Sequence, residues 1–153
     1  MIIVPGGFGG GGGNGTAPPF GAQRLILIAL LMGMACYAVV VGVLLSQQDW
    51  VGLAEPGIEI LETVSLAVGG AALVGALVLR SVLSGRAEAA APEQRPLLAF
   101  QARLMPVAIL EGGVLLSITA WMLNGGLMPY VAVAGVLFAI AILFVPFTDP
   151  DAQ

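Results

Sequence analysis

Long apolar stretches alternate with short polar segments along most of the chain. Each stretch contains 20 to 23 residues, and these are residues 25–45, 57–79, 104–123 and 127–147. The first and last carry no charge, the second carries only Glu59 and Glu62 near its start, and the third carries only Glu111. A helix rises about 1.5 Å per residue, so about 20 residues cross a hydrocarbon core of about 30 Å. The pattern therefore predicts four membrane-spanning segments.

These stretches are apolar on every face, whereas strands of a membrane barrel alternate apolar and polar residues. Helices satisfy their own backbone hydrogen bonds in lipid, so the predicted fold class is all-α. We expect a polytopic integral membrane protein with one transmembrane domain of four helices over residues 23–148. The glycine-rich residues 1–22 are expected to form a flexible tail, and residues 149–153 a short one.

The composition indicates a lipid environment and excludes several classes of function. Hydrophobic residues make up 59% of the chain and charged residues 9%, too few charges for a water-exposed surface. The expected surroundings are therefore a lipid bilayer. With no histidine and a single cysteine, Cys36, a metal site and the usual nucleophilic catalytic sets are not expected, and neither is a cofactor. Five basic residues against nine acids exclude a nucleic-acid surface. We predict that the protein is not an enzyme.

The basic residues predict the orientation of the helices. All five are arginines: Arg24 precedes the first apolar stretch, and the other four lie at or between the second and third stretches. The positive-inside rule then places both termini and a central loop over residues 81–100 in the cytoplasm. The predicted location is the bacterial cytoplasmic (inner) membrane. Pro92 and Pro96 are expected to prevent one continuous helix through the central loop.

The first and third apolar stretches resemble each other. Aligning Arg24 with Arg103 also matches Leu25 with Leu104 and Gly33 with Gly112, while Met32 falls opposite Glu111. This pattern is compatible with two repeated hairpins, and equally with chance matches between apolar runs.

Glu111 is the first candidate for chemistry, because it lies about 10 Å inside the third apolar stretch. A charged carboxylate at that depth costs at least about 2.5–3.5 kcal/mol, so a protonated, paired or hydrated group is expected. One hypothesis is a proton or cation carrier. The other is a structural hydrogen bond to a neighbouring helix, with possible partners Ser65, Thr63 and Thr119.

The acids of the second stretch allow two interpretations as well. Glu59 and Glu62 are three residues apart, which suits either the start of a helix or an outer vestibule that attracts cations. Glu62 is therefore a second ion-binding candidate. Its depth differs from that of Glu111 by roughly 12 Å, which argues against direct pairing.

Small residues and aromatic residues predict how the helices pack. Gly69, Gly75, Gly112 and Gly113 are the candidate packing glycines, because small residues let helices approach closely in lipid. The accompanying small residues are Ser65, Ala67, Ala71, Ala108 and Ser117. Trp50, Trp121 and Tyr130 are expected at the outer interface, and Tyr37 is expected to hydrogen-bond inside the bundle.

Residues 67–123 resemble the helical hairpin of the rotary ATPase proteolipid family, the c subunits. The matching features are Gly69, Gly70 and Gly75 in one helix, then Gln94-Arg95-Pro96 in the loop, then Glu111 in the next helix. The resemblance implies that Glu111 is an ion-binding carboxylate. Two functions therefore follow from the sequence: a small integral subunit that packs within a larger membrane complex or a homo-oligomer, or proton or cation translocation through Glu111.

Overall fold

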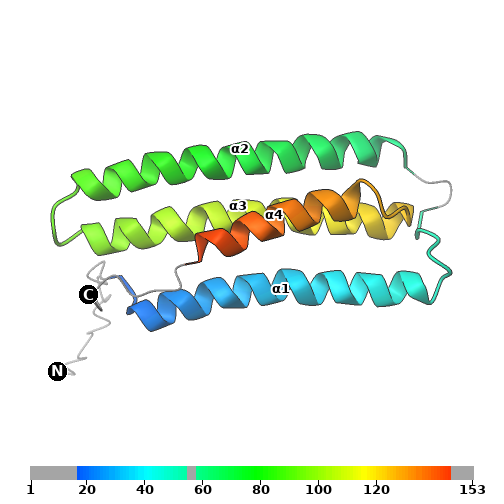
Figure 1. Cartoon of the computed structure of the whole chain (residues 1–153), viewed down its shortest axis with the longest axis horizontal. Helices are drawn as coiled ribbons and strands as arrows, with labels where there is room; N and C mark the ends of the chain where they lie inside the picture. The colour runs from blue at the N-terminus through cyan, green and yellow to red at the C-terminus, as the bar shows by residue number, and fades with distance from the viewer. Residues whose placement is uncertain (1–16, 55–57, 146–153) are drawn as a thin grey trace, which may run out of the picture.

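The computed structural model describes residues 17–54 and 58–145, which form four helices in an up-down-up-down order (Figure 1). They are α1 (Phe20–Ser46), α2 (Ile60–Ala89), α3 (Arg95–Asn124) and α4 (Tyr130–Phe144). The all-helical prediction is confirmed. Helices α1, α2 and α3 are long and apolar enough to cross a membrane. Helix α4 has 15 residues and extends about 22 Å, and positions 146–147 of its predicted span lie outside the described residues.

Helix α3 occupies the centre of the bundle and packs against each of the other three helices. Helices α1 and α2 flank it on opposite sides and, over the described residues, do not contact each other. Half of the most apolar 18-residue window of α3 is buried, against 17% for α1 and 22% for α2. The two halves of the described chain therefore pack differently, because α3 contacts α4 whereas α1 does not contact α2.

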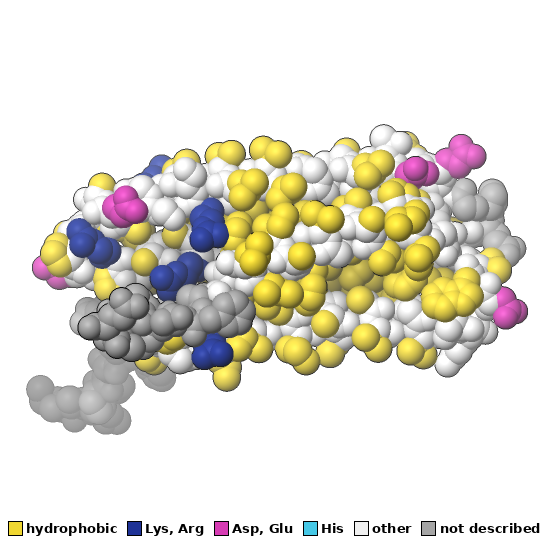
Figure 2. Space-filling view, in the orientation of Figure 1, with side chains coloured by type: hydrophobic (Ala, Val, Ile, Leu, Met, Phe, Trp, Pro, Cys, Tyr) yellow, Lys and Arg dark blue, Asp and Glu magenta, His cyan; other side chains and the backbone are white. Residues whose placement is uncertain are grey.

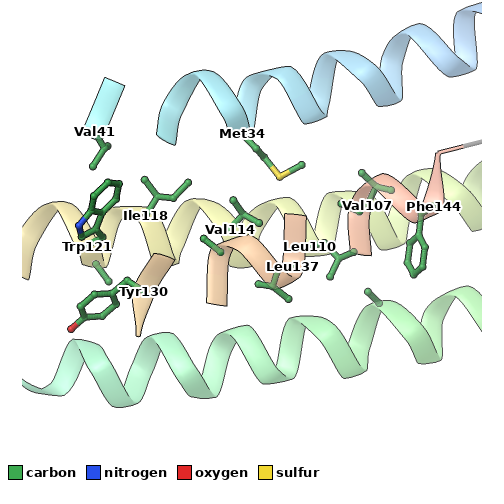
Figure 3. Close-up of a cluster of buried hydrophobic side chains, with 14 of the residues drawn as sticks. Met34, Val41, Val107, Leu110, Val114, Ile118, Trp121, Tyr130, Leu137 and Phe144 are labelled. Carbon is green, nitrogen blue, oxygen red and sulfur yellow. The ribbon is translucent and has the colours of Figure 1, made fainter. Parts of the chain in front are cut away.

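The core lies on both sides of α3 and α4: one part faces α1 and the other faces α2 (Figure 3). On α1, Leu27, Met34 and Val41 recur every seven residues and form one buried stripe, as in helices that pack at a shallow angle. Leu110 of α3 and Leu137 of α4 are also buried, but they point to the other side, toward α2. Burial of this one stripe leaves most of the apolar surface of α1 exposed.

The predicted central loop is much shorter than residues 81–100. Helix α2 continues to Ala89 and α3 begins at Arg95, so only residues 90–94 connect them. The polar composition predicted a loop, but polar and charged residues occur equally well in the ends of helices that extend past an apolar segment. Pro92 lies in the connection, as expected, whereas Pro96 lies in the first turn of α3, where a missing N–H costs nothing. Pro106 lies within α3 and does not end the helix.

The loop after α1 packs on the C-terminal end of α3. The N–H groups of Leu53 and Ala54 donate to the carbonyl oxygens of Met122 (3.1 Å) and Leu123 (3.0 Å), which lie in the last helical turn. Gly125 ends α3 in a left-handed conformation with φ 73°. The loop after α1 is therefore a cap that satisfies free carbonyls of α3.

Candidate functional site

Glu111 lies on α3 at the border between its buried and its exposed faces. Leu110 beside it is fully buried, whereas Gly112 on its other side is exposed. The Glu111 side chain is half-buried, and within residues 17–54 and 58–145 its carboxyl has no hydrogen-bond or ion-pair partner. The Glu111 carboxyl group therefore lies at the edge of the bundle and not in its core.

The hydrogen-bond partners expected for Glu111 are occupied elsewhere. The Ser65 hydroxyl of α2 donates to the Ser117 hydroxyl of α3 at 3.1 Å, and both side chains are buried. The Thr119 hydroxyl lies 3.0 Å from the Tyr37 hydroxyl of α1. Thr63 is exposed. The predicted hydrogen bond of Tyr37 is confirmed, and the predicted bonds from Glu111 to Ser65 and Thr119 are not present.

Glu62 and Glu111 do not form a common site. Ser65 and Ser117 are in contact. Glu62 lies one turn from Ser65 toward the loop after α1, and Glu111 lies six residues from Ser117 in the opposite direction. The two carboxyl groups are therefore separated by about 13 Å along the bundle. Glu59 is the N-cap of α2 and Glu62 lies in its first turn, so the acidic pair starts the helix. The part of the chain that the structure describes contains no cluster of metal ligands.

Two of the four candidate packing glycines lie at helix contacts. A Cβ atom on Gly113 would lie 2.8 Å from Leu137 Cδ1 and 3.0 Å from Ala72 Cβ, and one on Gly69 would overlap Val133. Around Gly75 and Gly112 there is open space. Within the described part of the chain, Gly75 and Gly112 therefore make no close helix contact, and their role in packing stays a prediction.

The small-residue face of α2 also differs from the predicted one. Ser65, Gly69, Ala72 and Ala76 are buried against the neighbouring helices, whereas Ala67 and Ala71 are exposed. Small residues cover more than one face of α2, so their spacing alone could not identify the face that meets α3. On α3, Ala108 and Gly112 likewise face outward.

The polar end of the bundle, where α1 begins and the connection between α2 and α3 lies, carries all five arginines (Figure 2). A cavity of about 530 Å³ opens there between α2 and α3, and it is lined by Arg80, Arg95, Arg103, Glu88 and Ser84 together with three alanines. Charge counting in the sequence did locate these arginines at one end of the molecule. It could not show that three of them line one cavity, because that depends on α2 and α3 continuing as helices beyond the apolar stretches.

Comparisons with protein-family models, curated proteins and solved structures found no match to this chain.

Proposed function

We propose that this protein is a small multi-pass subunit of the bacterial cytoplasmic membrane that associates laterally with other membrane helices, of partner subunits or of further copies. Both termini and the connection between α2 and α3 then lie in the cytoplasm. Three helices with the length and apolarity of membrane spans support this setting. The arginines at one end support the orientation, because basic residues remain on the cytoplasmic side.

The observation that carries the proposal is the exposed face of α3 around Glu111. Ala108 and Gly112 are exposed one turn apart, and the half-buried Glu111 adjoins them. In lipid, small residues allow another helix to approach closely, and a polar side chain gains from a partner that shields it from hydrocarbon. A neighbouring helix packed on this face could approach closely and would also shield the Glu111 side chain from hydrocarbon. We name the surface formed by Ala108, Glu111 and Gly112 the open face of α3.

A bulky residue at Gly112 tests the proposal. Gly112→Leu should leave the bundle folded, because open space surrounds this position, but should separate the protein from its partners. The measurement is the apparent size of the protein in mild detergent extracts by blue native electrophoresis. Gly135→Leu is the matched control, since Gly135 is also exposed and surrounded by open space, but on α4. An unchanged size for Gly112→Leu, or an equal change for both variants, would contradict the proposal.

Cation or proton transfer through Glu111 is a second candidate function, as the resemblance to the proteolipid family implies. It is favoured by the half-burial of a carboxyl group far inside an apolar helix. One observation argues against it. Ser65 bonds to Ser117, and Tyr37 bonds to Thr119, so these hydroxyls do not hydrogen-bond to Glu111 as a relay toward the outer end would require.

Carboxyl chemistry separates this candidate from lateral association. Labelling with dicyclohexylcarbodiimide should be selective for Glu111 and reduced by the transported cation if Glu111 is a carrier. Glu111→Gln would then abolish transport into vesicles while the assembly keeps its size. Under the association proposal, Glu111→Gln retains hydrogen-bonding capacity, so assembly persists and no transport is lost.

A further inference from the structure

We propose that the cavity lined by Arg80, Arg95 and Arg103 binds the phosphodiester headgroup of an anionic phospholipid at the end of α4. The inference rests on the membrane setting of the proposed function, but not on association through the open face of α3. Nothing in the arrangement around Glu111 requires this cavity.

The cavity is the continuation of the groove in which α4 lies. Helix α4 packs against both α2 and α3 and ends at Phe144, whereas α2 and α3 extend further toward the polar end (Figure 1). Past Phe144 the groove between α2 and α3 is lined by Ala87, Ala99 and Ala102. These short side chains leave a volume of about 530 Å³. Over residues 17–54 and 58–145, α4 thus fills this groove along most of its length and leaves it open where arginines border it.

The charge of the lining favours a phosphate group. Three guanidinium groups and one carboxylate, that of Glu88, give the lining a net positive charge, and the Ser84 hydroxyl adds a hydrogen-bond donor. Arginine binds phosphate oxygens through a planar pair of N–H groups, a geometry that lysine lacks. Every basic residue of the chain is an arginine. Figure 2 shows dark-blue side chains gathered at this part of the surface, with apolar side chains beginning directly beside them.

Two of the arginines are positioned by contacts that leave N–H groups for a ligand. The Arg80 guanidinium carbon lies 4.1 Å from the centre of the Phe144 ring, a cation–π contact that uses the face of the guanidinium and not its N–H edge. One nitrogen of Arg95 donates to the carbonyl oxygens of Glu88 (3.3 Å) and Ala90 (3.5 Å) at the end of α2. A guanidinium has five N–H donors, so most of those on Arg95 remain available.

The height of the cavity points to a lipid as the source of the phosphate. Arg80 directly follows the predicted span 57–79, and Arg103 directly precedes the span 104–123. Both arginines therefore lie where hydrocarbon gives way to headgroups, and basic pockets between helices on the cytoplasmic side suit lipid headgroups. Leu143, next to Phe144, is 74% exposed and offers apolar surface for an acyl chain beside the headgroup.

The test is the thermal stability of the purified full-length protein in a neutral detergent with added lipid. Phosphatidylglycerol should raise the melting temperature by several degrees, whereas phosphatidylcholine should not, because its headgroup has no net charge. Arg80→Gln combined with Arg103→Gln should abolish the rise. Arg86→Gln with Arg24→Gln is the matched control: it removes the same charge from arginines at the same end that do not line the cavity, and the rise should persist.

Three outcomes would overturn the proposal. An equal loss of the rise in both double variants would show general attraction to a basic surface. An equal rise with inorganic phosphate or glycerol phosphate would assign the cavity to a soluble anion. A rise that occurs only after Asp149→Asn and Asp151→Asn would show that these carboxylates, which follow α4 in the sequence, compete for the arginines. If Arg80→Gln with Arg103→Gln fails to fold, lysine at both positions retains the charge but lacks the bidentate geometry of arginine. Native mass spectrometry should then show weaker lipid retention by the lysine variant than by the unaltered protein. Equal retention would count against the site.

Discussion

Gly112 and Gly113 are adjacent in the sequence, yet their surroundings are opposite. Gly113 faces Ala72 and Leu137, and Gly112 faces open space. Successive residues of a helix differ by about 100° in direction, so one step along α3 moves from the buried face to the exposed face. The pair therefore separates two roles of glycine within one turn: close packing inside the chain, and a surface on which another helix can lie.

Alanine at each of the two positions should have different effects on stability. Helix propensity favours alanine over glycine by about 1 kcal/mol at both sites. At Gly113 this gain is opposed by overlap with Leu137 and Ala72, and overpacking costs about 1–3 kcal/mol. Gly113→Ala should thus melt at a lower temperature in detergent than Gly112→Ala. A Gly113→Ala protein as stable as Gly112→Ala would contradict the contact between α3 and α4.

At the residue scale the sequence predicted one polar contact inside the bundle but not the direction of most side chains. The internal hydrogen bond of Tyr37 followed from its position in an apolar stretch. The surroundings of Glu111 and Gly75 did not, because a helix apolar on all sides gives no preferred face. In a soluble protein, polar residues mark the outer face. Lipid removes that signal.

At the scale of elements, the loop after α1 is the part of the fold that depends most on exact backbone contacts. Asp49 and Trp50 have φ values of 52° and 62°, which reverse the chain and stack the Trp50 ring on Trp121 at 6.3 Å between ring centres. Gly52 then lies directly against the backbone of Leu123 and Asn124. Side chains would prevent this approach, so glycine at position 52 allows the cap on α3.

Gly52→Ala should release this cap. A Cβ atom there would overlap the carbonyl oxygen of Leu123, and the loop could only move away by losing the hydrogen bonds of Leu53 and Ala54. Two lost hydrogen bonds correspond to about 2 kcal/mol of unfolding free energy. The measurement is the free energy of unfolding in mixed micelles. Gly126→Ala is the control, because its nearest contact is an ordinary 3.8 Å; equal losses in the two variants would rule out the cap.

The existence of the four helices was predictable and several of their ends were not. Apolar stretches mark only the apolar part of a helix, so α2 and α3 were predicted without the polar segments that extend past Arg80 and before Arg103. Those segments are amphipathic and pack against each other. Sequence composition alone assigned them to a loop. The start of α2 was predicted within three residues, since Glu59 and Glu62 mark its first turn.

At the scale of the whole molecule, the arrangement around α3 explains why both proposals concern surfaces of this helix. Helices α1 and α2 lie on opposite sides of α3, and α4 covers only one of the two remaining directions. The uncovered direction carries Ala108 and Gly112. In the part of the chain that the structure describes, α4 ends before it covers the other direction completely, and Arg103 lines the cavity there. Sequence patterns could not reveal this asymmetry, because it depends on which helix pairs contact each other.

The orientation in the membrane provides the last prediction. Single cysteines at Gln48 and Gln94, in a Cys36→Ser background, lie in the loops at opposite ends of the bundle and are both exposed. Five arginines share the end that contains Gln94, and moving such charges across the membrane is unfavourable. A maleimide that cannot cross membranes should therefore label the cysteine at position 48 in intact cells, and the one at position 94 only after lysis. Labelling of position 94 in intact cells would reverse the orientation, and would place the arginine-lined cavity on the outer surface.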